Sequence, residues 1–161
     1  MGIKPDHLRT YVIEPSLDKL GSRYKSQDAV ELLLMIAAHE SHLGTYLHQE
    51  GGPAVGIYQM EPDTFHDCFV NYVRYNPILE NALSNFHQLP MPYNMAFDLS
   101  YATAMARVQL YRAPDRLPHR TDISGMAAYA KKYWNTELGK ATVEDYEKAY
   151  RDLVLGEKDV K

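Results

Sequence analysis

Proline and glycine residues divide this chain into segments of helical length, and this spacing restricts the possible folds more than any other feature of the sequence. Within the segments, apolar residues recur every three or four positions, as they do on the buried face of an α-helix. Alternating β-branched runs are absent, and only residues 55–60 could form a short strand. The sequence therefore predicts a mostly α fold of about seven helices.

Start and stop signals indicate where these helices lie. The clearest one is expected over residues 28–42, beginning at Ser26 or Asp28 and stopping at Gly44. Further helices are expected from about Asp6 to before Pro15, after Pro62, from Pro77 to about Gln88, over residues 94–111, from Asp122 or Ser124 to Tyr133, and after a capping-box pair at Thr142 and Asp145. A chain of 161 residues is expected to fold as one domain over residues 1–161.

The composition is that of an ordinary globular protein and argues against several functional classes. Hydrophobic residues make up 45% of the chain, and the longest apolar run, residues 32–38, is too short to span a bilayer. Cys68 is the only cysteine, so no internal disulfide framework is expected. The formal net charge is −4, which argues against non-specific binding to nucleic acid. We therefore expect neither membrane insertion nor a nucleic-acid partner.

Basic residues gather in one part of the sequence. Between Arg107 and Lys132 the chain has six basic and two acidic residues, a local net charge of +4. Such a stretch indicates either a solvated surface or a surface that meets an anionic polymer. We favour the solvated surface.

An acidic residue continues the apolar face of the predicted helix over residues 28–42. Leu33, Ile36, Ala37 and Glu40 fall on one face of this helix. Burying an unpaired carboxylate is costly, and the negative end of the helix dipole adds to that cost, so we expect this carboxyl to stay protonated near neutral pH. A protonated carboxyl is the general acid that glycoside cleavage requires. Glu40 is therefore a candidate catalytic acid, unless the helix has rotated and Glu40 points to solvent.

Two motifs follow one another at and after the end of this helix. The first is the pair Glu40-Ser41, and the second is Gly56-Ile57-Tyr58-Gln59-Met60-Glu61-Pro62-Asp63-Thr64. Together they resemble the signature of the soluble lytic transglycosylase and goose-type lysozyme superfamily, a Glu-Ser pair ending a buried helix and then a G-[LI]-x-Q-[ILMV]-x-P-x-T segment. Ala128-Tyr129 matches a third family motif, except that Ala130 replaces the usual Asn. The motif-bearing core would cover about residues 26–135.

The resemblance implies a lysozyme-like fold with a substrate cleft, and an enzyme that needs no cofactor or metal. The substrate would be the glycan strands of peptidoglycan, cut at the β-1,4 link between N-acetylmuramic acid and N-acetylglucosamine. By analogy, Glu40 protonates the leaving oxygen, and Ser41 and Gln59 position groups in the cleft. Tyr129 would line the cleft wall near the acid.

Tyrosine is abundant, and some of these rings are candidates for sugar contacts. The chain has 13 tyrosines among its aromatic residues, and a tyrosine can contact the apolar face of a sugar while its hydroxyl hydrogen-bonds. Tyr46, Tyr58 and Tyr129 lie in or near the motif segments, so we expect them in the cleft. The other tyrosines are expected to be packing residues.

The residue at position 61 bears on the type of reaction. Lytic transglycosylases need one carboxyl, which donates a proton and then takes one from the muramic 6-hydroxyl as an anhydro ring closes. Goose-type lysozymes have an Asp two residues after the Gln, where this chain has Glu61, and Asp63 lies close by. Either could be the base that activates water, and two carboxyls about 6.5–9.5 Å apart would mean inverting hydrolysis. Alternatively, both only stabilise a helix N-terminus.

Three other interpretations remain open at this point. His39, Glu40 and His42 superficially resemble a zinc-binding H-E-x-x-H motif, with His48 or His66 as a further ligand. The two histidines are three and not four positions apart, so we expect no metal site. A non-catalytic glycan-binding or structural module could keep the same fold, and an unrelated all-α interaction domain would make the two motifs coincidental.

The N-terminus suggests a route to the substrate. We expect no classical signal peptide here, because no apolar core is followed by a small-residue cleavage site. A short chain of this kind looks like a phage lysis enzyme or a virion-associated wall hydrolase. We expect a monomer that is made in the host cytoplasm and reaches the cell wall after holin-type release or delivery in a virion.

Overall fold

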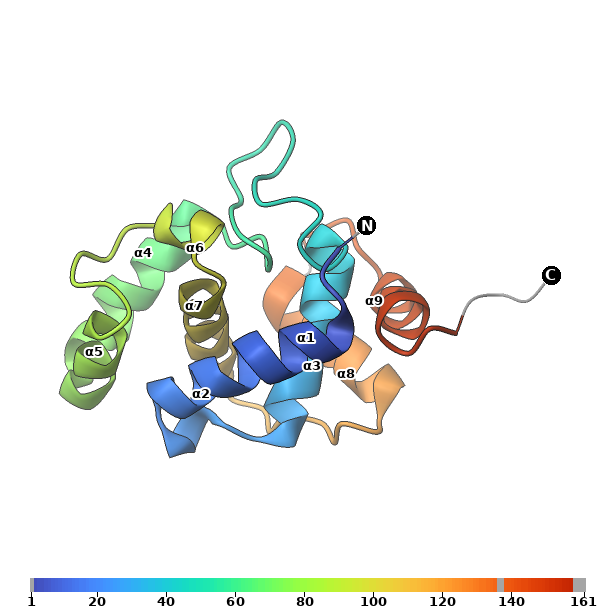
Figure 1. Cartoon of the computed structure of the whole chain (residues 1–161), viewed down its shortest axis with the longest axis horizontal. Helices are drawn as coiled ribbons and strands as arrows, with labels where there is room; N and C mark the ends of the chain where they lie inside the picture. Colours follow the sequence, from blue (N-terminus) through green and yellow to red (C-terminus); the bar gives the residue numbers. More distant parts are fainter. Residues whose placement is uncertain (1, 136–137, 158–161) are drawn as a thin grey trace.

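The structure is a computed structural model that describes residues 2–135 and 138–157, and these are mostly helical (Figure 1). In chain order the α-helices are α1 (Pro5–Leu8), α2 (Glu14–Leu20), α3 (Gln27–Ser41), α4 (Pro62–Asn71), α5 (Pro77–Ser84), α6 (Asn94–Phe97), α7 (Leu99–Tyr111), α8 (Ile123–Ala130) and α9 (Val143–Ala149). The π-helical turns η1 (Arg9–Ile13), η4 (Lys131–Asn135) and η5 (Tyr150–Val154) continue α1, α8 and α9, and η2 (Ser22–Tyr24) and η3 (Val73–Tyr75) are short 3-10 turns. The prediction of a mostly α fold is confirmed.

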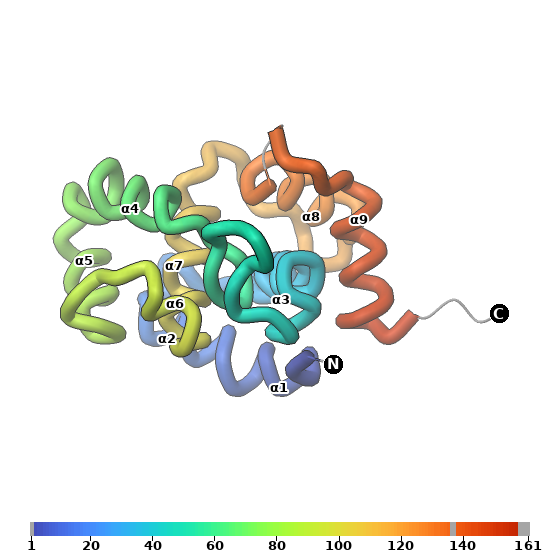
Figure 2. The backbone as a smooth tube through the Cα atoms, turned by 90° about the horizontal axis from the view of Figure 1, so that it is seen from above, coloured from blue at the N-terminus to red at the C-terminus, as the bar shows by residue number. Residues whose placement is uncertain are grey.

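Helix α3 is the centre of the molecule. It packs against η1, α7, α8, α9 and η5, and the other helices surround it in Figures 1 and 2. Every residue from Leu32 to Ala38 is buried, so the helix is apolar on all sides rather than on one stripe. Its start is as expected, because Ser26 accepts a hydrogen bond from the backbone N–H of Ala29 at 3.0 Å. Because the helix is buried, the position of Glu40 in its last turn is fixed.

The first helix does not stop before Pro15, as the sequence predicted. The chain passes through η1 into α2 and remains helical to Leu20. Proline interrupts a helix because it lacks an N–H and its ring collides with the carbonyl four residues earlier. Here Pro15 lies in the first turn of α2, directly after the wider π-helical turn, where that collision is relieved. The result is one continuous helical rod beneath α3.

The predicted helix over residues 94–111 is broken in two. Asp98 is extended, and its carboxylate accepts the N–H of Tyr101 at 3.0 Å, so it caps α7. The other carboxylate oxygen lies 2.7 Å from Nε2 of His87. Because of this break and the π-helical division of the first rod, the described residues contain nine α-helical segments rather than about seven.

Residues 45–60 form a long loop held by a few β-type contacts. Val55 and Met60 exchange two backbone hydrogen bonds at 2.9 and 3.1 Å, and Val55 also pairs with His48. The predicted short strand over residues 55–60 is therefore present only as isolated bridges. Figure 2 shows this loop lying over the C-terminal end of α3, next to α6.

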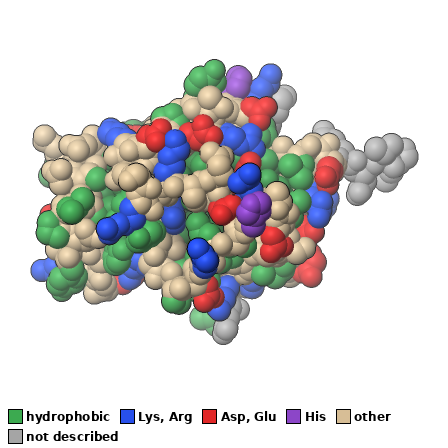
Figure 3. All heavy atoms as spheres, turned by 90° about the horizontal axis from the view of Figure 1, so that it is seen from below, with side chains coloured by type: hydrophobic (Ala, Val, Ile, Leu, Met, Phe, Trp, Pro, Cys, Tyr) green, Lys and Arg blue, Asp and Glu red, His purple; other side chains and the backbone are tan. Residues whose placement is uncertain are grey.

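The basic stretch over residues 107–132 does not form a continuous positive surface. Arg107 is buried, and its Nε donates to the carbonyl of Tyr24 at 2.7 Å. Arg112 pairs with Asp67 at 2.8 Å, and Lys132 pairs with Asp115 at 3.1 Å. Acidic and basic side chains are also interspersed on the face of the molecule in Figure 3. These observations favour the solvated surface over one that binds an anionic polymer. In the part of the chain that is described, no helix is both long and apolar enough to cross a membrane.

Candidate functional site

A cleft of about 700 Å³ opens at the C-terminal end of α3. One side of the cleft comes from the 45–60 loop and α4, and the other from η4, the segment after it and α9. Its lining residues are His39, Glu40, Gln49, Ala54, Gln59, Met60, Glu61, Thr64, Gln109, Tyr133, Trp134, Asn135, Gly139, Lys140, Ala141 and Asp145. The structure thus brings Glu40, Gln59 and Glu61 together in one concave site, as the sequence predicted.

Three successive left-handed residues end α3 immediately after the Glu-Ser pair. His42, Leu43 and Gly44 have φ values of 50°, 58° and 86°. The helix was expected to run to about His42 and ends at Ser41, but its left-handed cap is His42 and not the expected Gly44. The abrupt end leaves Glu40 in the last turn, where its side chain can leave the core and enter the cleft.

The carboxyl of Glu40 is nearly buried and has a specific partner. Its side chain is 18% exposed, and Tyr146 in α9 donates a hydrogen bond to Oε1 at 2.6 Å. Burial, and then the neighbouring Glu40 charge, raise the pKa of Tyr146, so its phenol stays protonated as a donor. Nδ1 of His39 lies 3.4 Å from the same oxygen, and the His39 ring packs on Tyr146 at 4.1 Å. The carboxyl is therefore oriented from one side.

Ser41 connects α3 to the second motif instead of reaching the cleft. It is fully buried, and its hydroxyl donates to the carbonyl of Ile57 at 2.6 Å and accepts the N–H of Gly44 at 2.9 Å. The expectation that Ser41 helps to position groups in the cleft is wrong for direct contact, because its buried hydroxyl does not line the cleft and cannot touch a substrate. It fixes the 45–60 loop on the end of α3.

The second motif folds tightly, and this explains two of its residue types. Gly56 has φ +83°, and a Cβ there would lie 2.5 Å from the carbonyl oxygen of Met95. Only glycine allows the backbone to approach α6 this closely. Gln59 also has a left-handed backbone, with φ 54°, and its side chain Nε2 donates to the carbonyl of Gly56 at 2.9 Å. A strained non-glycine residue in a cleft is typical of functional sites.

The two acidic residues after Gln59 have different positions. Glu61 is exposed, precedes the first turn of α4, makes no side-chain capping hydrogen bond and lines the cleft with Glu40. Asp63 is exposed in the first turn of α4 and does not line the cleft. Of the two candidate bases, Glu61 is therefore the one that faces the site.

The expected tyrosine contacts are wrong in this structure. Tyr58 is 1% exposed and its hydroxyl is hydrogen-bonded to Thr103 at 2.8 Å, because the loop turns this ring into the core. Tyr129 is also buried, and its hydroxyl donates to the carbonyl of Asp115 at 3.3 Å. Tyr46 is exposed but lines a different groove. None of the three lines the cleft beside Glu40.

The aromatic residues of the cleft are ones that sequence reasoning missed. Tyr133 and Trp134 line it from η4, and Trp134 Nε1 donates to the carbonyl of Tyr58 at 3.2 Å. Tyr146 was expected only as one of the packing tyrosines, yet its hydroxyl donates to Glu40. The capping box at Thr142 placed its helix correctly, but nothing local indicated a partner 106 positions away.

Known proteins give no guide to this site. No family model, curated protein or solved structure gave a significant match in the three comparisons. Among the described residues, no three His, Cys, Asp or Glu side chains lie together so that they could hold a metal ion. The functional interpretation therefore depends on the residues and geometry of the cleft.

Proposed function

We propose that this protein is a peptidoglycan-cleaving glycosidase with a lysozyme-like cleft, which cuts the β-1,4 link between N-acetylmuramic acid and N-acetylglucosamine. The observation that supports this most strongly is the position of Glu40. A carboxyl in the last turn of a buried helix lines a cleft, receives one hydrogen bond and shares the cleft lining with a second carboxyl, that of Glu61. Two carboxyls across a cleft are the arrangement that glycosidases use.

Glu40 would act as the general acid. Because Tyr146 donates to Oε1, that oxygen is an acceptor, and the proton for the glycosidic oxygen is best carried on Oε2. Proton transfer to that oxygen lets the C1–O bond break, and the electron pair of the bond leaves with the departing sugar. The positive charge that develops on the muramic ring is then next to the Glu40 carboxylate.

Two routes can complete the reaction. In the first, the Glu40 carboxylate takes the proton of the muramic 6-hydroxyl, whose oxygen bonds to C1 and closes an anhydro ring. In the second, Glu61 takes a proton from water, and the hydroxide oxygen bonds to C1. The presence of Glu61 in the same cleft supports the second route, so we propose hydrolysis as the main reaction.

The remaining cleft residues suit a sugar polymer. Amide side chains of Gln49, Gln59, Gln109 and Asn135 line the cleft, and each has one amide atom bonded within the protein. Their remaining hydrogen-bonding capacity can serve sugar hydroxyls and acetamido groups. Trp134 is held in place through its Nε1–H. Its ring can offer an apolar surface to a sugar face.

Mass analysis of digested peptidoglycan tests the proposal. We expect soluble muropeptides with a reducing muramic acid, and loss of this turnover in Glu40→Gln, which keeps the shape but cannot donate an acidic proton. Products ending in 1,6-anhydromuramic acid, one water lighter, would replace the hydrolytic route with the first one. No soluble product from any wall type, or full turnover by Glu40→Gln, would overturn the assignment. Retained strand binding without cleavage would then indicate a non-catalytic glycan-binding module.

A further inference from the structure

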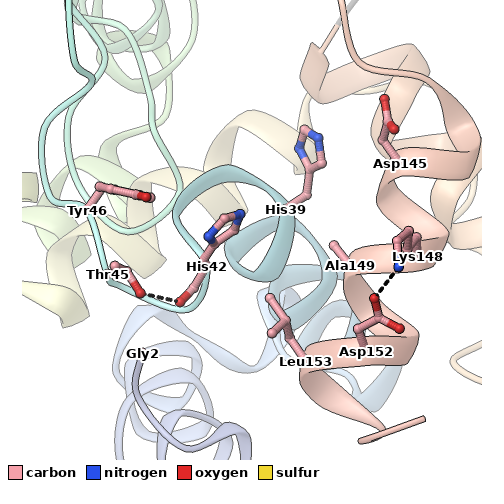
Figure 4. A pocket seen from close by; sticks show the side chains of 10 residues that line it. All are labelled: Gly2, His39, His42, Thr45, Tyr46, Asp145, Lys148, Ala149, Asp152 and Leu153. Atoms are coloured by element: carbon pink, nitrogen blue, oxygen red, sulfur yellow. Dashed lines mark hydrogen bonds and ion pairs between the residues drawn. The ribbon is translucent and has the colours of Figure 1, made fainter. Parts of the chain in front are cut away.

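A second groove adjoins the cleft on the other side of the end of α3. Its volume is about 580 Å³, and it runs between the start of the 45–60 loop and the helical rod of α9 and η5 (Figure 4). Its lining residues are Gly2, His39, His42, Thr45, Tyr46, Asp145, Lys148, Ala149, Asp152 and Leu153. Two of these, His39 and Asp145, also line the cleft. One residue of the groove, His39, is therefore the direct sequence neighbour of the proposed acid, Glu40.

The groove differs from the cleft in the chemistry of its walls. The cleft is lined largely by amides and other polar groups, whereas this groove has apolar sides formed by Tyr46, Ala149 and Leu153. Along these sides lie charges of both signs. Lys148 donates to Asp152 at 2.5 Å, and His42 projects from the opposite wall in Figure 4. Tyr46 packs near His42, with ring centroids 5.7 Å apart.

We propose that this groove binds the peptide stem that the muramic acid of the substrate strand carries, which rests on the proposed function. The stem is attached through the lactyl ether of the muramic ring whose C1 is in the cleaved bond, so it must exit the cleft close to Glu40. The groove shares His39 and Asp145 with the cleft, and His39 directly precedes Glu40 in α3. A stem has small alanine side chains, free carboxylates and the ammonium group of a diamino acid. The apolar walls complement the alanine side chains, and the Asp152 carboxylate complements the ammonium group. The Lys148 ammonium and an N–H of the His42 ring can donate to the carboxylates.

The charged residues of the groove lie along its α9 and η5 side. Asp145 and Asp152 lie on α9 and η5, seven residues apart on one side of the groove. A stem lying along this side would place its ammonium group near Asp152 and a carboxylate near Lys148. Lys148 and Asp152, which pair with each other in this structure, would then each also contact a group of opposite charge on the stem. Charged hydrogen bonds of this kind give selectivity because each unmatched partner is left unpaired.

Strands with and without stems test the proposal. Peptidoglycan strands would be compared with the same strands after an amidase has removed their stems. Asp152→Asn removes one charge of the groove, and Leu153→Arg obstructs it from an exposed position. For both variants we expect kcat/KM on stem-bearing strands to fall about tenfold, with stripped strands cut as by the wild type. Ile78→Arg, at an 84% exposed site on α5, is the control and should change neither rate.

Equal losses on both kinds of strand would show that the groove holds glycan, and no loss on either would show that it holds nothing; both results overturn the proposal. If the wild type cuts neither strand, the proposed function fails, and a binding experiment decides the groove separately. Synthetic tetrapeptide stems with L-Lys or meso-diaminopimelate would be titrated into labelled protein. NMR shifts at Ala149 and Leu153 in the wild type, with the Ala149 shift lost in Leu153→Arg, support a peptide site, and no shift with either stem overturns it.

Discussion

At the scale of single residues, the hydrogen bond from Tyr146 to Glu40 is the contact that orients the proposed acid. It orients one carboxyl oxygen from a ring that is itself fixed by burial. We expect Tyr146→Phe to keep the fold and to lower kcat about tenfold with little change in KM, because the substrate still binds but the acid is no longer held. Steady-state kinetics on peptidoglycan fragments measures both constants.

A matched control is available for this prediction on the same helical rod. Tyr150 is buried, and its hydroxyl donates to Glu31 at 3.3 Å, away from the cleft. Tyr150→Phe loses a comparable hydrogen bond to a carboxylate, so it should show the same small loss of thermal stability and unchanged kcat. If both variants lose activity equally, Tyr146 supports the fold and not the acid.

Substitutions at two glycines distinguish the cost of backbone strain from the cost of a steric clash. Gly51 and Gly56 both have positive φ, but a Cβ meets nothing within 4 Å at Gly51 and meets the Met95 carbonyl at Gly56. Gly51→Ala should therefore cost about 1 kcal/mol of unfolding free energy from the backbone alone. Gly56→Ala should cost about 1–3 kcal/mol more, because α6 must also move. Urea unfolding of the two variants measures the difference, and equal costs would contradict the proposed contact.

At the scale of elements, Ser41 holds the 45–60 loop on α3. Its buried hydroxyl links the helix end to both Ile57 and Gly44. Ser41→Ala leaves the carbonyl of Ile57 and the N–H of Gly44 without that partner, and we expect a loss of about 1–3 kcal/mol of unfolding free energy. Amide exchange should accelerate in residues 55–60 and stay unchanged in α7. Uniform acceleration, or none, would mean that the loop is held elsewhere.

Some features of the helices could be predicted from the sequence, and others could not. The caps at Ser26 and Thr142 were predicted correctly, because a cap is a contact between residues three positions apart. Pro15 was misjudged, because a π-helical turn that precedes it has no simple residue signature. The break at Asp98 was missed since Asp98 caps a helix and also pairs with His87 across space. Local rules fail where a distant partner determines the backbone.

The same division holds for the site. Glu40 and Gln59 could be placed from motif and spacing, because the helix end and the turn fix both side chains. Tyr58 was expected in the cleft, but which side of an irregular loop faces the core depends on Thr103 and α7. Tyr146 and Trp134 could not be predicted, because their partners are 106 and 76 positions away.

At the scale of the whole molecule, buried tyrosines limit stability at high pH. Burial raises the pKa of Tyr58, Tyr101 and Tyr146, and raises that of Tyr150 to about 12. Each favours the folded state fully below the ordinary tyrosine pKa of about 10. That contribution is lost as the pH rises, because the unfolded chain then releases protons that the folded chain retains. We therefore expect stability to fall steeply above about pH 10.

Absorbance and circular dichroism measured on one alkaline titration test this expectation. The buried tyrosines should ionise only as the helical signal disappears, so part of the tyrosinate absorbance should rise together with unfolding. Tyr58→Phe should shift the unfolding midpoint to higher pH. Complete tyrosine ionisation while the helical signal remains intact would contradict it.

The hydrogen bond between Glu40 and Tyr146 also has a consequence for biosynthesis. Its two ends are made at very different times, because 106 positions of chain separate them. A growing chain on the ribosome can form α3 and the loop over it long before α9 has been synthesised. Until then the carboxyl lacks its hydroxyl partner and the cleft lacks one wall. Under the proposed function, the nascent chain is inert until α9 has been synthesised and has docked on α3.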